Sequence, residues 1–218
     1  MNSVIKGVIF AFDLTLVDSA IAICGNLNAL AREKELRSLT LGEVRPTIGW
    51  ALVEAMRFFW GDGPAETEWL PRYRKLFVER NYAGVRAFKE TIPTLEYLKS
   101  SGASLAIATN RLTPSGIVCA AGLERYFPVI VGIDDHKPKP DPAIVLEAAR
   151  RMHFLPSEGM YVGDTGIDME TARNAGVRAV GVTSGNHTAD QLRKSGADFV
   201  IETLSELPKL WEELHGKV

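Results

Sequence analysis

KGVIFAFDLTLVDS, residues Lys6–Ser19, is the most informative stretch of the chain. Its apolar run, Val8 to Phe12, is unbroken and stops at Asp13. A short run of β-branched and aromatic residues that ends in an acid is typical of a buried parallel strand with a polar group at its carboxyl end. Ligands bind at that end of the strands in open α/β sheets. We therefore expect Asp13 to lie in a ligand site.

Signals for helices and strands alternate from Lys89 to the end of the chain. Repeated β-α units with short connections predict an α/β fold with a doubly wound, parallel, Rossmann-like sheet. The expected strands after the first are Ser104–Ala108, Val129–Gly132, Met160–Val162, Ala179–Val182 and Phe199–Ile201. The expected helices are Thr91–Ser100, Pro114–Ala121, the apolar stripe from Ile144 to Met152, the stripe from Met169 to Ala175, and Leu204–Leu214.

The segment between Asp18 and Val85 has a different pattern. Its apolar residues recur at helical spacing, and no run resembles a strand. An all-helical block inserted after the first strand predicts a separate small domain. We therefore expect a core of residues 1–17 and 86–218 and a helical domain of residues 18–85. The helical stretches are Ile23–Ala31, Ile48–Phe59 and Glu68–Arg80, and Asp18 with Ser19 is expected to start the first of them.

The composition of the 218 residues is that of an ordinary globular protein, with 46% hydrophobic and 24% charged residues and a net charge of −2. That charge gives no reason to expect binding to nucleic acids or membranes. The longest uncharged stretches, Ser19–Ala31 and Leu112–Leu123, are shorter than the ~18 residues that a membrane span needs, and we expect a cytoplasmic protein. Cys24 and Cys119 are expected to be free thiols, and the histidines lack the spacing of metal ligands.

Polar side chains stand at or just after the carboxyl ends of several expected strands. Strands that are adjacent in a parallel sheet bring these ends to one edge, so the topology predicts that the groups converge. Such a set suits phosphoryl transfer, because the negative charge spread over the phosphoryl oxygens needs a cation, fixed donors and a group that manages protons. The set consists of Asp13, Thr109 with Asn110, Lys137, and Asp164 with Asp168.

Each member of this set has a role that its chemistry suits. Asp164 is a hard oxygen ligand for Mg²⁺, and Asp168 is placed to hold the ion through water. Lys137 supplies a point charge and Thr109 a hydroxyl donor for phosphate oxygens. Asp13 is placed to protonate the leaving oxygen and later to activate water.

These segments resemble, in order, the motifs of the haloacid dehalogenase (HAD) superfamily of hydrolases. Phe10–Ser19 resembles the frame of the first motif, and Thr109-Asn110 resembles the second. The stretch KPKPD, Lys137–Asp141, resembles the third, and GDTGID, Gly163–Asp168, resembles the fourth. The resemblance covers essentially the whole chain. It implies a HAD core with a helical cap between the first two motifs, and it implies Mg²⁺ as the cofactor.

The resemblance also implies residue roles. Asp13 would act as the general acid and base and lend its backbone carbonyl to the metal. Asn110 would join Thr109 in holding the substrate. Simpler alternatives stay open for single residues, because Asp168 could merely cap its helix and Lys139 is expected to be solvated rather than catalytic.

The retained Asp13 indicates a subfamily. Dehalogenases of this superfamily lack the second acid of the first motif, whereas phosphatases and mutases keep it. The place of the cap and the wording LTLVDS, Leu14–Ser19, are most similar to the phosphoglycolate phosphatase-like branch. This resemblance implies a phosphatase whose partner is a small phosphorylated metabolite, a phosphate ester of an organic acid or a sugar. We expect a monomer or a homodimer.

The helical cap of the family closes over the active site. In this chain its tryptophans, Trp50, Trp60 and Trp69, are expected to form the core of the cap, with the alternative that one of them shields the site from water. Arg45 is the cap cation that we would test as a contact of a substrate phosphate or carboxylate. The alternative for Arg45 is a solvated surface position.

Position 11 departs from the family pattern. The family has an aspartate there, the nucleophile that takes the phosphoryl group and also binds the metal, whereas this chain has Ala11. A methyl group can neither attack phosphorus nor ligate a metal. Three interpretations stay open. The alanine was introduced into an otherwise active phosphatase, or the protein has lost hydrolysis and serves as a phosphate-ligand-binding or regulatory module, or residual hydrolysis proceeds by direct water attack with Asp13 as base.

Overall fold

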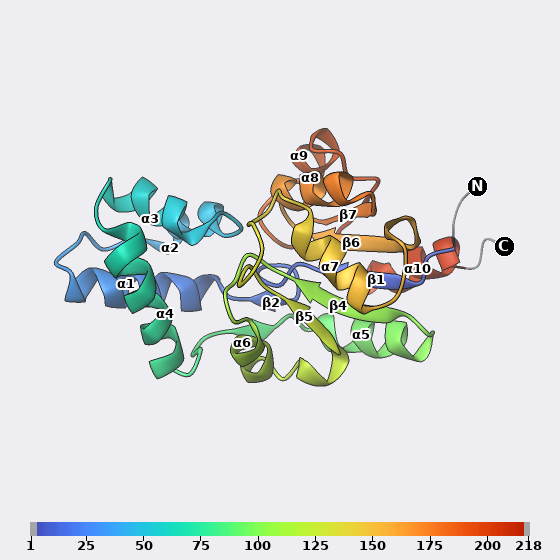
Figure 1. The fold of residues 1–218 in the computed structure, drawn as a ribbon, viewed down its shortest axis with the longest axis horizontal. Coiled ribbons are helices and arrows are strands. Elements are labelled where there is room, and N and C mark those ends of the chain that lie inside the picture. Colours follow the sequence, from blue (N-terminus) through green and yellow to red (C-terminus); the bar gives the residue numbers. More distant parts are fainter. Residues whose placement is uncertain (1–3, 216–218) are drawn as a thin grey trace.

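The computed structural model describes residues 4–215. At its centre is a six-stranded sheet in the order β5-β4-β1-β6-β7-β8, and every neighbouring pair is parallel. This arrangement confirms the predicted α/β fold with a doubly wound parallel sheet (Figure 1). The strands are β1 Gly7–Phe10, β4 Ser104–Ala108, β5 Val129–Val131, β6 Gly159–Gly163, β7 Arg178–Val182 and β8 Phe199–Ile201.

Helices accompany the strands of the core. The prediction of Thr91–Ser100 agrees with α5 at both ends, and Gly102 beyond it has a φ of 82°. The short helix α9 was not predicted. Among residues 4–215, no helix has the length and hydrophobicity that crossing a membrane requires. The core helices are α5 Thr91–Ser100, α6 Ser115–Ala120, α7 Ala143–Arg151, α8 Gly166–Ala175, α9 Ala189–Lys194 and α10 Leu207–His215.

β1 lies in the middle of the sheet and all its residues are buried. Val8 and Phe10 belong to a hydrophobic cluster that includes residues of α5 and α10. Ile9 belongs to a second cluster, which includes residues of α7 and α8. A strand that is covered on both faces needs an unbroken apolar run rather than alternation. This requirement explains the pattern of the Val8–Phe12 segment.

A helical block lies between β1 and β4 in the chain and to one side of the sheet (Figure 1). The short strands β2, Val17–Asp18, and β3, Arg86–Ala87, pair antiparallel where the chain enters and leaves this block. The predicted domain of residues 18–85 begins and ends at this ribbon, and we refer to it as the cap. Its helices are α1 Ala20–Glu33, α2 Leu41–Val44, α3 Leu52–Trp60 and α4 Leu70–Glu79, with a short π-helix, Ala65–Trp69, before α4.

The helix predicted over Ile48–Phe59 begins only at Leu52. Arg45–Thr47 forms a 3₁₀ turn, and Gly49 has a φ of 111°, so the chain changes direction before α3. Gly49 also approaches the core closely, because a Cβ added to it would lie 3.2 Å from a methyl carbon of Thr165. A glycine suits both the left-handed conformation and the close approach.

Trp60 and Trp69 contact each other inside the cap, whereas Trp50 lines the cavity described below. Trp69 is 5% exposed, and its ring centroid lies 5.7 Å from that of Trp60 in an edge-to-face contact. Trp69 belongs to the hydrophobic cluster that extends from the sheet into the cap, and the partly buried Trp60 packs against it, which agrees with the predicted place of both in the core of the cap. Trp50 is 39% exposed and contacts Phe58 edge-on instead.

Candidate active site

A cavity of about 190 Å³ lies between the carboxyl edge of the sheet and the cap. The loops that follow β1, β4, β5 and β6, together with the start of α8, supply its floor, so the structure brings together polar groups at these strand ends, as the parallel topology predicts. Two predicted site residues, Lys137 and Arg45, are not in the lining. The floor consists of Ala11, Asp13, Thr109, Asn110, Arg111, Lys139, Asp164 and Asp168.

Asp13 is held in place by charge and hydrogen bonds. Its carboxylate accepts hydrogen bonds from Arg111 Nε and Nη2, both at 2.7 Å, and from Ser19 Oγ at 2.6 Å. Burial alone would raise the pKa of Asp13, but the Arg111 guanidinium outweighs burial and lowers it. Ser19 therefore orients Asp13 instead of capping α1, whose first N–H, that of Ala20, bonds to Asp18 Oδ1 at 3.1 Å. Asp13 is an oriented anion.

Arg111 connects the core to the cap. It follows Thr109 and Asn110 at the end of β4, and its guanidinium carbon lies 5.2 Å from the centroid of the Phe77 ring on α4. A guanidinium over an aromatic face is attracted by the ring quadrupole. Arg111 was not predicted as a site residue, although a cation directly after a polar pair at a strand end is a usable signal in the sequence.

The cation of the site is Lys139, which corrects the prediction of Lys137. Lys137 is exposed, whereas the Lys139 side chain is 6% exposed and its Nζ lies 2.6 Å from Asp168 Oδ1. The backbone N–H of Lys139 donates to Asn110 Oδ1 at 2.7 Å, which anchors this part of the loop to the second motif. Burial lowers the pKa of Lys139, but the charge of Asp168 outweighs burial and raises it. The expectation that Lys139 is solvated was wrong.

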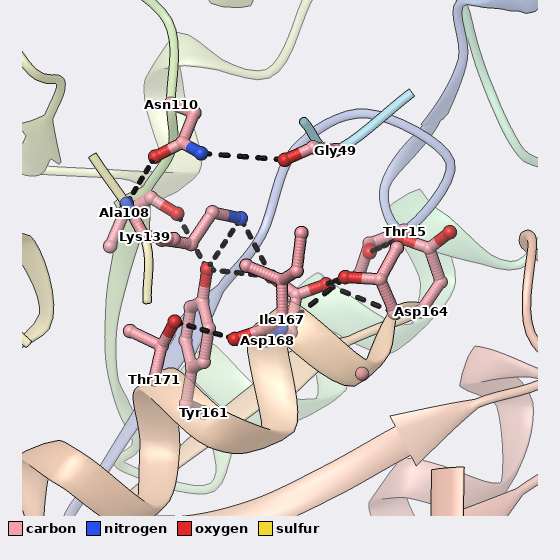
Figure 2. Close-up of polar contacts among 12 residues, drawn as sticks. Thr15, Gly49, Ala108, Asn110, Lys139, Tyr161, Asp164, Ile167, Asp168 and Thr171 are labelled. Atoms are coloured by element: carbon pink, nitrogen blue, oxygen red, sulfur yellow. Dashed lines mark hydrogen bonds and ion pairs between the residues drawn. The ribbon is translucent and has the colours of Figure 1, made fainter. Parts of the chain in front are cut away.

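Tyr161 on β6 completes this network (Figure 2). Its hydroxyl lies 3.2 Å from Lys139 Nζ, 3.2 Å from Asp168 Oδ1 and 2.9 Å from the Ala108 carbonyl oxygen. Asp168 also accepts a hydrogen bond from Thr165 Oγ1 at 2.6 Å and forms a capping box at the start of α8. Asp168 therefore caps its helix and also lines the cavity, and its role in holding a metal ion through water stays a prediction.

Asp164 is buried without a cationic partner. Its carboxylate accepts hydrogen bonds from Thr15 Oγ1 at 2.9 Å and from the Asn186 backbone N–H at 3.0 Å. Among the described residues, no lysine or arginine lies within ion-pair distance of it. Burial and the nearby charge of Asp168 raise the pKa of Asp164. A cation would relieve this electrostatic cost.

The donor set at Asp164 fits a weakly held Mg²⁺. This ion is usually bound by one or two carboxylates, with water and substrate phosphate as the other ligands. Residues 4–215 contain no cluster of three or more His, Cys, Asp or Glu side chains that could hold a metal by themselves. Asp13 is turned to Arg111 and Asp168 to Lys139, so Asp164 is the carboxylate that is free to ligate.

Arg45 lies at the junction between cap and core and outside the cavity lining. This position differs from the prediction that Arg45 contacts the substrate. Its Nη2 lies 3.5 Å from the Gly185 carbonyl oxygen. Asn186 strengthens this junction, because its side-chain amide donates to the carbonyls of Arg45 at 2.9 Å and Ile48 at 3.0 Å. A Cβ on Gly185 would lie 2.3 Å from the Cβ of Asp164, so only glycine allows this loop to approach the acid.

Asn186 was also missed by the sequence analysis. It follows the carboxyl end of β7, where the rule applied to the other strands would have identified Thr183–Asn186 as a polar loop at the same edge. On the opposite side of the site, the Asn110 amide donates to the Gly49 carbonyl at 3.4 Å (Figure 2). Residues of the second motif and of this loop therefore both hold the cap segment before α3.

Comparisons with known proteins agree with this geometry. The family model for haloacid dehalogenase-like hydrolases matches residues 8–182. The chain belongs to this family. The HAD-like hydrolase is 32% identical to the phosphoglycolate phosphatase of Caulobacter vibrioides, over 94% of this chain and 91% of that protein. It is also 32% identical to the protein of Dickeya dadantii named "Probable phosphatase IndB", over 92% of this chain and 90% of that protein.

Solved structures of the family share the fold. A haloacid dehalogenase-like hydrolase from Streptococcus pneumoniae superposes on this HAD-like hydrolase with a TM-score of 0.84 and 23% identity, over 95% of this chain and 98% of that one. A Bacteroides fragilis chain described as belonging to the same family has a TM-score of 0.83 and 29% identity, over 93% of this chain and 99% of that one. The resemblance to the superfamily and its phosphoglycolate phosphatase-like branch is confirmed.

Proposed function

We propose that this HAD-like hydrolase has the site of a Mg²⁺-dependent phosphatase for small phosphate monoesters, the class that includes 2-phosphoglycolate. The observation that carries the proposal is the buried ammonium of Lys139, which is paired with Asp168 and lines the same cavity floor as Asp13 and Asp164. A buried cation that shares a cavity with carboxylates for metal binding and proton transfer suits a transferring phosphoryl group. The phosphatases among the relatives support the same reaction class.

Lys139, Thr109 and Asn110 would hold the phosphoryl oxygens. The Thr109 hydroxyl makes no hydrogen bond to any of residues 4–215, and the residue lines the cavity, so this donor is available to a ligand. Tyr161 would keep the Lys139 ammonium in position from below. Asp164 would hold Mg²⁺, which, when bound, neutralises negative charge on phosphoryl oxygens.

The residue at position 11 determines the rate of ester hydrolysis that we expect of this chain. It lines the cavity in the loop after β1, and its methyl group offers no nucleophile. In the aspartyl-phosphate mechanism that we propose for the family site, this chain would bind the ester but turn it over very slowly or not at all. Whether the alanine was introduced or is natural does not alter this chemical consequence.

A second candidate function, a phosphate-ligand-binding or regulatory module, is favoured by the Asp13–Arg111 pair. A general acid must carry a proton near the working pH. The guanidinium lowers the pKa of Asp13 and occupies both of its oxygens, so Asp13 in this conformation is a poor acid. In this alternative the site would bind phosphate esters without hydrolysing them.

Binding of inorganic phosphate, measured by calorimetry with Mg²⁺, tests the site. Lys139→Ala should weaken the affinity at least about tenfold, the usual cost of losing a charged hydrogen bond. Lys137→Ala is the matched control and should bind like the parent, because Lys137 is exposed and outside the lining.

Lys139→Ala also removes the partner of Asp168, so a second variant guards against a folding defect. Thr109→Val removes only the free hydroxyl and should also weaken binding. Equal affinity in the parent, Lys139→Ala and Thr109→Val, with the folded far-UV spectrum retained, would rule out this phosphate site.

A further inference from the structure

The cap side of the cavity differs in chemistry from its floor. The floor is polar, whereas the opposite wall consists mainly of aliphatic and aromatic side chains from α1, from the turn and first residues of α3, and from α4. The side chains that matter here are Ile23, Leu27, Trp50, Leu52, Val53 and Leu70.

Few polar groups interrupt this wall. The hydroxyl of Thr47 donates to the Val44 carbonyl at 2.8 Å and is therefore already used within the cap. Tyr73 is buried and lines the cavity, and its hydroxyl, kept neutral because burial raises its pKa, is one hydrogen-bonding group of this wall. Arg74 is the cation that the cap contributes to the lining, and it is half-buried.

The wall therefore offers few hydrogen-bonding groups to replace the water that sugar hydroxyls would lose. A buried polar group without a hydrogen-bond partner is costly, whereas apolar surface gains from leaving water. An ester whose organic group is a polyol would meet this penalty at each hydroxyl turned to the wall. An ester with an apolar organic group would gain at the same positions.

The size of the cavity limits that group. Its volume of about 190 Å³ is below the ~300–1,000 Å³ of pockets for drug-sized ligands, so a nucleotide is too large. A dry apolar cavity of about 150 Å³ accepts benzene. The space thus suits a phosphoryl group together with one small ring or branched chain.

Trp50 is the residue at the open side of this wall. Its exposure of 39% is high for a large aromatic residue, and its edge-on contact with the exposed Phe58 continues the apolar surface outward. If one cap tryptophan shields the site, that residue is Trp50, and it would cover the organic group of a ligand.

We propose that the organic group of the preferred phosphate ester is a small apolar ring or branched chain that packs on this wall, rather than a carboxylate or a polyol. The proposal deepens the proposed function and rests on phosphate binding at Lys139. It places the specificity of the site in Trp50 and Leu52 rather than in Arg74.

Calorimetry on the chain as it stands, with Mg²⁺, tests the proposal, using inorganic phosphate, phenyl phosphate, 2-phosphoglycolate and glucose 6-phosphate. Phenyl phosphate should bind at least about tenfold more tightly than 2-phosphoglycolate or glucose 6-phosphate, the discrimination expected of a small apolar pocket. Tighter binding of 2-phosphoglycolate, or equal binding of all the esters, would overturn the proposal.

Matched variants locate the effect. Leu52→Ala and Trp50→Ala should weaken phenyl phosphate severalfold and leave inorganic phosphate unchanged. Ile21→Ala, an exposed aliphatic residue of α1 outside the lining, is the control and should change neither. Arg74→Gln should leave phenyl phosphate binding unchanged, and a loss there with no effect of Leu52→Ala would assign specificity to the cation and overturn the proposal.

The test separates this inference from the proposed function. If inorganic phosphate binds and depends on Lys139 but phenyl phosphate has no advantage, only the apolar specificity is wrong. If no phosphate compound binds, both proposals are wrong.

Discussion

Arg111 and Asp13 form a two-pronged ion pair at the centre of the site, with Arg111 Nε 2.7 Å from Asp13 Oδ2 and Arg111 Nη2 2.7 Å from Asp13 Oδ1. The side chains are 19% and 16% exposed, so water screens the pair little. Such bidentate pairs are among the strongest hydrogen-bonded contacts in proteins. The pair ties the loop after β1 to the loop after β4 and holds Asp13 in its ionised form.

Arg111→Gln should raise the pKa of Asp13. Burial favours the neutral acid, and the substitution removes the positive charge that counteracts burial in the parent. A carboxyl-selective NMR titration measures this shift. The substitution should also destabilise the fold by about 3 kcal/mol, at the lower end of values for breaking a buried pair. Arg125→Gln, at an exposed arginine, is the control and should do neither.

The pH dependence of that stability loss follows from the direction of the Asp13 pKa shift. The folded pKa of Asp13 is depressed, so the pair stabilises the parent above the unfolded value of about 3.9, and this contribution is lost as the pH falls through the folded pKa. The gap in unfolding free energy between parent and Arg111→Gln should therefore be constant at pH values above both folded pKa values of Asp13. It should narrow as the pH falls through the raised pKa of Asp13 in the variant and on through the depressed pKa in the parent. A gap that widens in acid would contradict this assignment.

The fold and most of the site could be predicted because both depend on local or topological signals. The ends of α5 follow from an apolar stripe and a terminal glycine, and Asp13, Thr109 and Asp164 converge because parallel strands end at one edge. The helix α9 was missed because only Leu192 of its residues is buried, so it lacks an apolar stripe.

The lysine of the third motif could not be chosen from the sequence. Lys137 and Lys139 are separated by one proline, and it is the folded loop, with Lys139 Nζ paired to Asp168 and the Lys139 N–H bonded to Asn110, that turns Lys139 into the site. The direction of the Arg45 side chain depends on how the cap packs against the core, and no local sequence pattern predicts that packing.

Tyr161→Phe should weaken phosphate binding even though Tyr161 itself does not contact the ligand, because Tyr161 acts through Lys139. The change removes a hydroxyl that lies 3.2 Å from both Lys139 Nζ and Asp168 Oδ1 and leaves the ring in place. We expect a stability loss of about 1–2 kcal/mol and a lower affinity for inorganic phosphate. Thermal unfolding and calorimetry measure the two effects.

Tyr97→Phe provides the comparison for this change, because the Tyr97 hydroxyl pairs with Glu212 at the surface. Surface changes of this kind usually cost less than about 0.5 kcal/mol. If the two variants behave alike, Tyr161 has no positioning role.

Asn186→Ala should loosen the attachment of the cap segment before α3. It removes the hydrogen bonds to the Arg45 and Ile48 carbonyls but keeps the backbone N–H that reaches Asp164. Amide exchange in residues 45–50 should become faster, with a stability loss of about 1–2 kcal/mol. Asn174→Ala removes an exposed amide contact to Pro140 and serves as the control. Unchanged exchange in the Asn186 variant would show that the cap does not depend on this junction.

The most direct measurement of the proposed function is phosphate release by Ala11→Asp and by the chain as it stands, with Mg²⁺ and a panel that contains phenyl phosphate and 2-phosphoglycolate. Ala11→Asn is the matched control, because its side chain has a similar size but cannot act as the nucleophile. We predict that only the aspartate variant releases phosphate, at least about 10³-fold faster than the other two, the scale of nucleophile deletions. A folded Ala11→Asp variant that releases no phosphate above the level of Ala11→Asn would contradict a phosphatase site that lacks only its nucleophile.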